Sequence, residues 1–532
     1  MTQTSYVDFA RAYDAGKASL VATTLVADLE TPVSAFLKLT AARAANVFLL
    51  ESVEGGAARG RYSMIGLDPD IVWRATGDVC EINRTALHAA DAFERQDEKP
   101  LDALRALIAE SRIDADASLP PMAAGVFGYL GYDMVRQMER LPAPKPDPIG
   151  VPDAVMIRPT LMVVFDSVRD ELSIVTPVRP QAGLDARAAW EAAQARLDAV
   201  VAVLESPLAH TPPAADPHLL AAPPRSNTPE ARYLDMVERA KEYIRAGDIF
   251  QVVLSQRFTA PFHLPAFSLF RALRRVNPAP FLCYLDFGGF QIVCSSPEIL
   301  VRVREGKVTI RPIAGTRWRG KTPAEDQALA DELLADPKER AEHLMLLDLG
   351  RNDVGRVAQI GTVDVTGQFF IERYSHVMHI VSNVEGKLDP QHDVIDALCA
   401  GFPAGTVSGA PKVRAMEIID ELEIDKRGIY AGCIGYFGAS GEMDTCIVLR
   451  TAVIKDGQMH AQAGAGVVYD SLPENEHREC VNKAAALFKA AEEAVRFATS
   501  ARGGSKCQPG SPGPRGTSII PAIAKCQRGI QV

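Results

Sequence analysis

The sequence predicts an α+β protein with large, mainly antiparallel sheets covered by helices. In the C-terminal half, short strand patterns joined as hairpins stand between helical patterns, whereas a doubly wound parallel sheet would alternate single strands with helices. The length of 532 residues, of which 47% are hydrophobic, suffices for two or three ordinary cores or for one large multilayer domain. These observations fix the class but not the number of domains.

The clearest helical pattern of the N-terminal half lies at residues 183–204. This segment is rich in alanine, and larger hydrophobic residues recur in it at the helical spacing: Trp190, Leu197, Val201 and Leu204. A second helix is expected to begin near Pro229 and to end at Gly247, because glycine readily adopts the left-handed conformation that terminates helices.

Residues 249–258, IFQVVLSQRF, predict a strand with one polar face. Hydrophobic side chains alternate along one side: Phe250, Val252, Leu254 and Phe258. The polar residues fall mostly on the other side: Gln251, Ser255 and Arg257.

Residues 299–313, ILVRVREGKVTIRPI, predict a hairpin that turns at Glu305-Gly306-Lys307. Two helices follow, with capping-box starts at Thr322-Pro-Ala-Glu325 and Asp336-Pro-Lys-Glu339. In each of them a proline occupies the first helical position, where it is well tolerated.

Proline and glycine content divides the chain into four regions. Residues 206–230 hold seven prolines and predict a linker or a long surface loop. The last region is rich in glycine, proline and serine with little periodicity, so we expect disorder there. The four expected regions are 1–205, 206–230, 231–500 and 501–532.

The charge balance argues against nucleic-acid and membrane partners. With 57 basic and 67 acidic residues, the net charge is −10, which disfavours non-specific adhesion to anionic polymers or surfaces. A small anionic substrate would therefore need local cations. The chain has no apolar run of 18 residues, and its first residues lack the basic and apolar blocks of a signal peptide. The nine cysteines are scattered without a CxxC pair, so reduced thiols and a cytoplasmic location are expected.

Residues 473–484, PENEHRECVNKA, gather negative charge directly after a glycine-rich stretch. A helix that begins at Pro473 would place three charged side chains on one face: Glu476, Glu479 and Lys483. Spacing alone favours a solvated face with acids near the positive end of the helix dipole. It leaves open a Mg²⁺ site, to which Glu342 in AEHLMLLDLGRND could add a carboxylate.

Two glycine-containing loops, at residues 402–412 and 462–470, match neither a phosphate loop nor a dinucleotide fingerprint. Their free backbone N–H groups suit a carboxylate instead. Arg450 could pair with the same anion, or it could be an arginine in a surface salt bridge. His379 lies in an apolar stretch, where a lone histidine is more often a core residue than a catalytic one.

Five motifs together resemble the chorismate-utilising enzymes, most closely the anthranilate synthase large subunits. The resemblance is dense from about residue 225 to 495 and looser from 30 to 205. It implies a four-layer α/β/β/α arrangement with two mainly antiparallel sheets and an active site between them, and it makes 231–500 the catalytic region. The motifs are PIAGTRWRG (312–320), DPKERAEHLMLLDLGRND (336–353), FPAGTVSGAPKVRAME (402–417), DTCIVLRTA (444–452) and QAGAGVVYDSLPENEHRECVNKA (462–484).

By this resemblance the chain is expected to be a Mg²⁺-dependent lyase that converts chorismate and ammonia to anthranilate and pyruvate, the first step of tryptophan biosynthesis. Glu298 in SSPE matches the general acid of the family, and His379 matches a histidine beside the substrate ring. The resemblance implies direct metal ligation by Glu342 and Glu479, with Glu476 at or near the ion. Further matched positions hold the carboxylates and the ring of chorismate: Thr406, Tyr430, Arg450, Gly464, Gly466 and Lys483.

Two positions distinguish the subfamilies. Gln251 stands where relatives that make isochorismate or salicylate carry a lysine, because water needs a general base whereas ammonia brings its own lone pair. Ala314 in PIAGT stands where aminodeoxychorismate synthases usually carry a nucleophilic lysine. Both residues favour anthranilate as the product, and aminodeoxychorismate and isochorismate are the nearest alternatives.

The resemblance also implies a partner and a regulator. The sequence shows no glutaminase motif, so a separate glutamine amidotransferase subunit is expected to supply ammonia in a hetero-oligomer, with free ammonia as the other source. The segment LLES (49–52) resembles the tryptophan-binding segment of the family, and feedback inhibition by tryptophan is expected. The residues expected to contribute are Leu50, Glu51, Ser52, Pro32, Arg61, Pro280 and Phe281.

An alternative of another class is a catalytically silent subunit that binds tryptophan or regulates a partner. The intact set of expected catalytic and metal-binding residues argues against it: Glu298, Glu342, Glu479 and His379.

Overall fold

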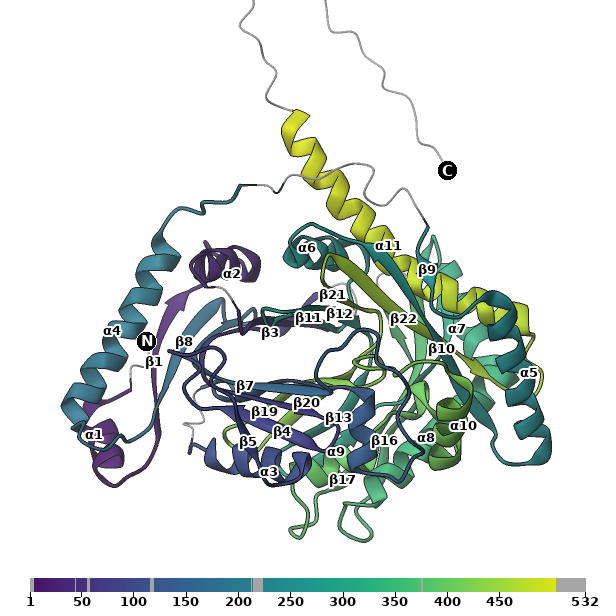
Figure 1. Cartoon of the computed structure of the whole chain (residues 1–532), viewed down its shortest axis with the longest axis horizontal. Helices are drawn as coiled ribbons and strands as arrows, with labels where there is room; N and C mark the ends of the chain where they lie inside the picture. Colours follow the sequence, from purple (N-terminus) through teal and green to yellow (C-terminus); the bar gives the residue numbers. More distant parts are fainter. Residues whose placement is uncertain are drawn as a thin grey trace, which may run out of the picture.

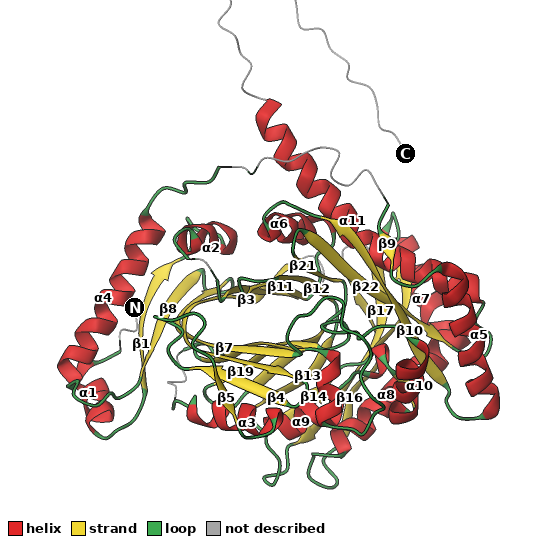
Figure 2. Ribbon diagram, viewed as in Figure 1, coloured by secondary structure: helices red, strands yellow, loops and turns green. Residues whose placement is uncertain are grey.

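The computed structural model describes residues 4–43, 45–54, 58–114, 119–211, 213, 223–374 and 377–503. Residues 212 and 214–222 of the expected linker and residues 504–532 of the expected tail lie outside this described part. Within it, all named strand pairs are antiparallel, and helices cover the sheets (Figure 1, Figure 2). The predicted α+β class with large antiparallel sheets is confirmed.

Two sheets share a pair of long strands, β3 (Ala58–Thr76) and β7 (Ala154–Asp166). The first sheet continues from this pair through β8 to β1 on one side and through β2 to β10 on the other, where β10 also pairs with β9 and β18. Its remaining strands are, in spatial order, β1 (Ser19–Val26), β8 (Glu171–Val178), β2 (Val47–Glu54), β11 (Phe281–Asp286), β12 (Gln291–Ser296), β21 (Thr451–Lys455), β22 (Gln458–Val467), β10 (Gln251–Pro261), β9 (Arg225–Ser226) and β18 (Gly409–Ala410).

The second sheet runs from β5 through the other halves of β3 and β7 to β17, which pairs with β14, β15 and β16. Its remaining strands are β5 (Glu94–Gln96), β4 (Val79–Asn83), β6 (Gly125–Leu130), β19 (Cys433–Gly438), β20 (Met443–Ile447), β13 (Ile299–Arg304), β14 (Lys307–Ile310), β17 (Val377–Lys387), β15 (Ile313–Trp318) and β16 (Asp364–Arg373).

A break in register between Pro69 and Ile71 marks where β3 passes from one sheet to the other. The first half of β3 pairs with β2, and its second half pairs with β4. A bulge of this kind bends a strand, so β3 can belong to both sheets. The hydrogen-bonded network is therefore continuous although the fold has two sheets.

Helices form the outer layers. One set packs on the outer face of the first sheet and shares a core with it: α1 (Tyr6–Asp14), α2 (Pro32–Thr40), α4 (Ala186–Glu205), α6 (Ala266–Val276) and α11 (Pro473–Gly503). The other set packs on the second sheet and on the β10 end of the first: α3 (Pro100–Glu110), α5 (Glu230–Ala246), α7 (Pro323–Ala335), α8 (Pro337–Gly355), α9 (Val394–Gly401) and α10 (Lys412–Leu422). Two short 3₁₀ helices are η1 (Tyr132–Gln137) and η2 (Gly405–Val407).

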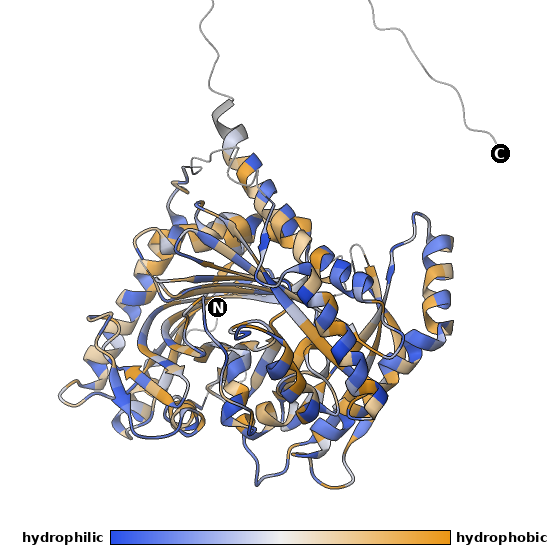
Figure 3. Cartoon of the chain, turned by 45° about the vertical axis from the view of Figure 1, so that its right-hand side comes forward, coloured by the Kyte–Doolittle hydropathy of each residue, from blue (hydrophilic) through white to orange (hydrophobic). Residues whose placement is uncertain are grey.

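A third hydrophobic core lies between the sheets, so the layers follow the predicted order of helix, sheet, sheet and helix. In Figure 3 the outer helices carry hydrophilic residues beside hydrophobic ones, as expected for helices with one face on a sheet. None of the helices in the described part is long and apolar enough to cross a bilayer.

Most of the local sequence signals are confirmed. Helix α5 ends at Gly247 with φ +83°, and β13 and β14 pair from Arg304 to Lys307 around the predicted turn. Thr322 and Asp336 cap α7 and α8. Neither predicted capping box is completed, because Glu325 accepts from the N–H of Lys321 and Glu339 accepts from Arg317.

Strand β10 differs in two respects from its prediction. It begins at Gln251, so Phe250 precedes it and is 72% exposed. Its polar residues Gln251, Ser255 and Arg257 are buried, because α5, α10 and α11 all contact the strand. Two of them find charged partners: the Arg257 guanidinium lies 2.6 Å from Asp425, and the Ser255 hydroxyl donates to Glu423.

Residues 1–205 and residues 231–500 contribute strands to both sheets. Strand β2 pairs with β11, and β6 pairs with β19. The expected tail begins at residue 501, whereas α11 extends to Gly503.

Candidate active site

The β10 end of the first sheet provides a glycine-lined surface where β10 pairs with β22. Gly464 lies opposite Ser255, and Gly466 lies opposite Val253. A Cβ atom added at Gly466 would lie 2.5 Å from Nε2 of Gln251, and one at Gly464 would lie 2.8 Å from the Tyr430 hydroxyl. Glycine at these positions therefore leaves the room that the Gln251 and Tyr430 side chains need.

Glu298 lies in the loop between β12 and β13, and it is 4% exposed. Burial raises the pKa of its carboxyl to about 8, against the opposing effects of hydrogen bonds from the Thr406 hydroxyl and the Ile313 backbone. The Thr406 Oγ1 donates to Glu298 Oε1 at 2.9 Å. This carboxyl therefore carries a proton near neutral pH and has the properties of a general acid.

His379 lies on β17, opposite Thr316 of β15. Its Nδ1 lies 2.9 Å from the carbonyl oxygen of Gly315 and 3.1 Å from Thr316 Oγ1. Because a carbonyl only accepts, Nδ1 carries the hydrogen and Nε2 keeps its lone pair. Burial lowers the pKa of His379 to about 4, with a smaller effect from the Arg450 charge, so the ring is neutral.

Arg450 follows β20 in the turn before β21 and has φ +49°. For a residue other than glycine this conformation is uncommon and is typical of functional sites. Burial lowers the pKa of its guanidinium. The Arg450 side chain forms no ion pair with any residue that the structure describes. A half-buried guanidinium without a carboxylate partner is a suitable anchor for an anionic substrate.

Gln251 and Glu342 bring β10 and α8 together. The Gln251 Nε2 lies 3.5 Å from Glu342 Oε1, and the buried Gln251 Oε1 has no hydrogen-bond partner among the residues that the structure describes. A buried amide oxygen without a hydrogen-bond partner is uncommon in folded proteins. This oxygen is therefore free to accept a hydrogen bond from a bound molecule.

Helices α8 and α11 present the three expected metal ligands. Burial raises the pKa of Glu342, and the neighbouring carboxylates of Glu339 and Glu479 raise it further. Burial likewise raises the pKa of Glu476. The structure does not gather Glu342, Glu476 and Glu479 within 4.8 Å of one another.

Lys483 lies on the same face of α11 as Glu479, as predicted. Its Nζ lies 2.7 Å from Glu479 Oε1 and donates to the Gly464 carbonyl at 3.0 Å. This lysine therefore links the carboxylates of α11 to the glycine-lined strand β22.

The segment from η2 to β18 connects the two groups of residues. Thr406 of η2 contacts Glu298, while β18 pairs with β10 at Gln251. The η2 turn also contacts α8 and β22. Ala314 is buried on β15, opposite Ile380 and next in the strand to Gly315, whose carbonyl holds His379.

The expected tryptophan segment pairs with the strand that contains Phe281. Leu50, Glu51 and Ser52 lie opposite Cys283, Leu282 and Phe281, respectively. The structure thus brings Ser52 and Phe281 together across 229 residues of sequence.

The other expected tryptophan contacts lie on neighbouring elements. The Ser52 hydroxyl donates to the Tyr62 carbonyl, next to Arg61, which pairs with Asp166. Pro32 is the first residue of α2, which contacts β2 and β3, and Pro280 precedes β11.

Sequence reasoning missed several polar partners. Arg274 of α6 forms a two-pronged ion pair with Glu51, at 2.6 and 2.9 Å. Tyr374 contacts the ring of His379 at 5.5 Å and donates to Glu372 at 2.7 Å. No local pattern marks these residues, because each meets its partner through tertiary folding.

A family model described as "chorismate binding enzyme" matches residues 55–489. The chain is 57% identical over 505 residues to anthranilate synthase component 1 of Cereibacter sphaeroides, which covers 94% of this chain and 100% of that protein. It is 48% identical over 475 residues to anthranilate synthase component 1 of Pseudomonas putida, with 87% and 93% covered. Among solved structures, anthranilate synthase component I of Streptococcus pneumoniae matches with a TM-score of 0.70 at 37% identity, covering 87% of this chain and 98% of that one.

Proposed function

The chain belongs to the family of chorismate binding enzymes, and on this premise we propose that it is the large subunit of an anthranilate synthase. The reaction would convert chorismate and ammonia to anthranilate and pyruvate, with release of water. The observation that carries this proposal is the protonated, buried carboxyl of Glu298 in the same site as the unpaired cation Arg450. Together they supply a proton and an anchor for an anionic substrate.

Glu298 would protonate the C4 hydroxyl as it leaves, while ammonia adds at C2. The resulting loss of hydroxyl as water needs a proton at that oxygen, and a carboxyl with a pKa of about 8 holds one at neutral pH. The second step removes pyruvate and leaves the aromatic ring. His379 has a free Nε2 lone pair beside this site and would accept a hydrogen bond from the substrate.

Cationic side chains and the backbone would bind the substrate. The geometry supports Arg450 as one anchor and Lys483, held at the Gly464 carbonyl, as another. Tyr430 and the backbone of Gly464 and Gly466 would line the ring, because no side chain from β22 intrudes there.

The residues on α8 and α11 fit a Mg²⁺ site. Glu342, Glu476 and Glu479 are hard oxygen donors of the kind that Mg²⁺ prefers, and the like charges around Glu342 raise its pKa in a way that a divalent cation would relieve. Bound Mg²⁺ would supply positive charge for the ring carboxylate of chorismate. Glu342 and Glu479 would hold it, with Glu476 nearby.

Gln251 and Ala314 support anthranilate as the product. The Gln251 amide has no basicity at neutral pH, so it would not activate water, whereas it could accept a hydrogen bond from ammonia through its free Oε1. Ala314 offers no nucleophile beside His379. Isochorismate and aminodeoxychorismate are thereby disfavoured as products.

A glutaminase subunit would supply the ammonia, which is supported by the name "component 1" of the relatives. Feedback inhibition by tryptophan is supported by the similarity of LLES to the family segment and by its pairing with Phe281. The cytoplasmic location, the hetero-oligomer and the division into regions stay predictions.

The test is product formation by the purified chain with chorismate, Mg²⁺ and an ammonium salt at mildly alkaline pH. Anthranilate, measured by fluorescence and chromatography, should appear, disappear on chelation and decrease with added tryptophan. Isochorismate or aminodeoxychorismate as the main product would overturn the specificity argument, and absence of any turnover would overturn the proposed activity.

A further inference from the structure

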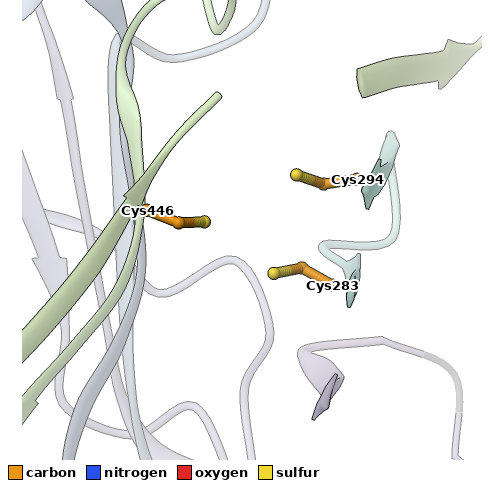
Figure 4. A group of neighbouring side chains, drawn as sticks. All are labelled: Cys283, Cys294 and Cys446. Carbon is orange, nitrogen blue, oxygen red and sulfur yellow. The ribbon is translucent and has the colours of Figure 1, made fainter. Parts of the chain in front are cut away.

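Three cysteines outside the candidate active site bring their thiols together in the core between the two sheets. Cys283 of β11 lies directly opposite Cys294 of β12. Cys446 of β20 comes from the second sheet. The three Sγ atoms all lie within 4.8 Å of one another, and the side chains point into a common space (Figure 4).

The thiols are almost completely enclosed. Cys283, Cys294 and Cys446 are 4%, 0% and 2% exposed, and they belong to a cluster of hydrophobic side chains. Among the described residues, no histidine or carboxylate joins the group. Three sulfur donors without an oxygen or nitrogen ligand suit a soft cation and are unsuited to Mg²⁺ or Ca²⁺.

The spacing of the sulfurs fits one metal ion. Metal–sulfur bonds of about 2.3 Å in zinc sites hold neighbouring sulfurs roughly 4 Å apart. This separation falls inside the 4.8 Å limit that the three Sγ atoms already satisfy. An ion could therefore bind without a large movement of the three strands.

Metal binding would deprotonate the thiols. A coordinating cysteine is a thiolate, so a divalent cation held by the three sulfurs would release three protons to solvent. The complex would then carry one net negative charge.

We propose that Cys283, Cys294 and Cys446 bind one soft divalent cation, of the class of Zn²⁺ and Cd²⁺, at a site separate from the carboxylates of α8 and α11. An ion bound at this site would lie on strands that lead to the candidate active site, so it would affect catalysis. Strand β12 leads into the loop that contains Glu298, and β20 leads towards Arg450. A bound ion would tie these two strands to β11, which pairs with the expected tryptophan segment.

The probe is Cd²⁺, titrated into the full-length, metal-free chain in the presence of a phosphine reductant. All nine cysteines must react as free thiols in the denatured protein before the titration begins. We expect one tightly bound Cd²⁺ per chain, about three released protons, a sulfur-to-cadmium charge-transfer band, and three sulfur neighbours by X-ray absorption. Excess Mg²⁺ should not displace the ion.

The Cys294→Ala variant should bind Cd²⁺ at least tenfold more weakly. Cys399→Ala is the matched control, because Cys399 is a half-buried thiol on α9 outside the cluster, and it should leave the affinity unchanged. Circular dichroism checks that both variants fold.

Fewer than three sulfur neighbours in the wild-type chain would overturn the proposal, and this measurement does not depend on the folding of any variant. Equal Cd²⁺ affinity of folded Cys294→Ala and the wild type would also overturn it. The outcome is independent of anthranilate formation, so the failure of either proposal leaves the other intact.

Discussion

Burial, more than residue type, gives Glu298 its expected chemistry. An exposed glutamate is ionised at neutral pH, whereas this carboxyl has a pKa of about 8. The Thr406 hydroxyl opposes the shift, because it donates to the carboxylate and stabilises the ionised form. Burial and the Thr406 hydrogen bond therefore have opposite effects on the pKa of Glu298, and both influence the pH range in which this residue can act as an acid.

The activity should fall as the pH rises through about 8, because Glu298 loses its proton there. The quantity to measure is kcat/KM for chorismate at a fixed concentration of free ammonia, since ammonia itself becomes more abundant at high pH. Glu298→Gln should lower kcat by about 100- to 10,000-fold, the usual contribution of a general acid.

Thr406→Val is the companion variant for this pH profile. Without the donated hydrogen bond, the pKa of Glu298 should rise, so the decrease in activity should move to higher pH. A profile that stays unchanged in Thr406→Val would show that another group titrates.

Gly466→Ala should lower kcat/KM at least tenfold, because its Cβ atom would lie 2.5 Å from the Gln251 amide and would displace it. Gly289→Ala is a matched control, since a Cβ atom there has no neighbour within 4 Å. Steady-state kinetics and circular dichroism of both variants check the expectation. Equal activity of the two variants would argue against a role for the Gln251 position.

At the scale of single elements, helices α8 and α11 carry the three expected metal ligands. Each is anchored by a core face. Glu342 of α8 meets the amide of Gln251, and Lys483 of α11 links Glu479 to the Gly464 carbonyl of β22. The helices are far apart in sequence, and their carboxylates become neighbours because α8 packs on the second sheet while α11 packs on the first.

Mg²⁺ should raise the thermal unfolding temperature of the wild-type chain, and a chelator should reverse the shift, because an ion that binds the folded state stabilises it. Glu342→Gln should remove most of this shift. Glu474→Gln changes an exposed glutamate on the first turn of α11 and should keep it. Differential scanning calorimetry with and without Mg²⁺ measures the shifts, and an undiminished shift in Glu342→Gln would contradict the expected ligand.

At the scale of the whole molecule, residues 1–205 and residues 231–500 are joined through both sheets. Beside the pairing of β2 with β11, the ion pair of Glu51 and Arg274 crosses between them. The side chain of Glu51 is 4% exposed and that of Arg274 is 21% exposed. Loss of the arginine would therefore leave a buried carboxylate without its partner.

Arg274→Met should lower the free energy of unfolding by about 2 kcal/mol, less than for a fully buried pair because the arginine is partly exposed. It should also weaken inhibition by tryptophan at least tenfold, while activity without tryptophan is kept. Urea denaturation and a tryptophan titration measure the two effects.

Arg271→Met, on the same helix, is the control for Arg274→Met. Arg271 is exposed, and its guanidinium contacts His210, so its loss should change neither stability nor inhibition appreciably. If tryptophan inhibits Arg274→Met as strongly as the wild type, this ion pair does not contribute to a tryptophan site.

Sequence predicts what local signals encode. The turn at Glu305-Gly306, the helix end at Gly247 and the helix start at Pro473 each depend on a few neighbouring residues, and all are confirmed. The expected catalytic residues followed from motif resemblance, and the structure places Glu298 and His379 in buried environments that shift their pKa values.

Long-range contacts escaped prediction. The pairing of Ser52 with Phe281 and the contact of Glu51 with Arg274 join residues more than 220 positions apart, and the cluster of three thiols needs Cys446 to meet the hairpin of Cys283 and Cys294. The burial of the polar residues on β10 was also missed, because an alternating pattern does not reveal that helices will cover the strand from outside.

The pairing of β6 with β19 has a consequence for synthesis of the protein on the ribosome. Strand β6 ends at Leu130, and its partner ends at Gly438. At about 5–20 residues per second, the ribosome would need roughly 15–60 s to make the intervening chain. During that interval one edge of β6 has no native partner, and an unpaired edge strand is a template for aggregation. The nascent chain should therefore depend on chaperones until nearly all of it has emerged.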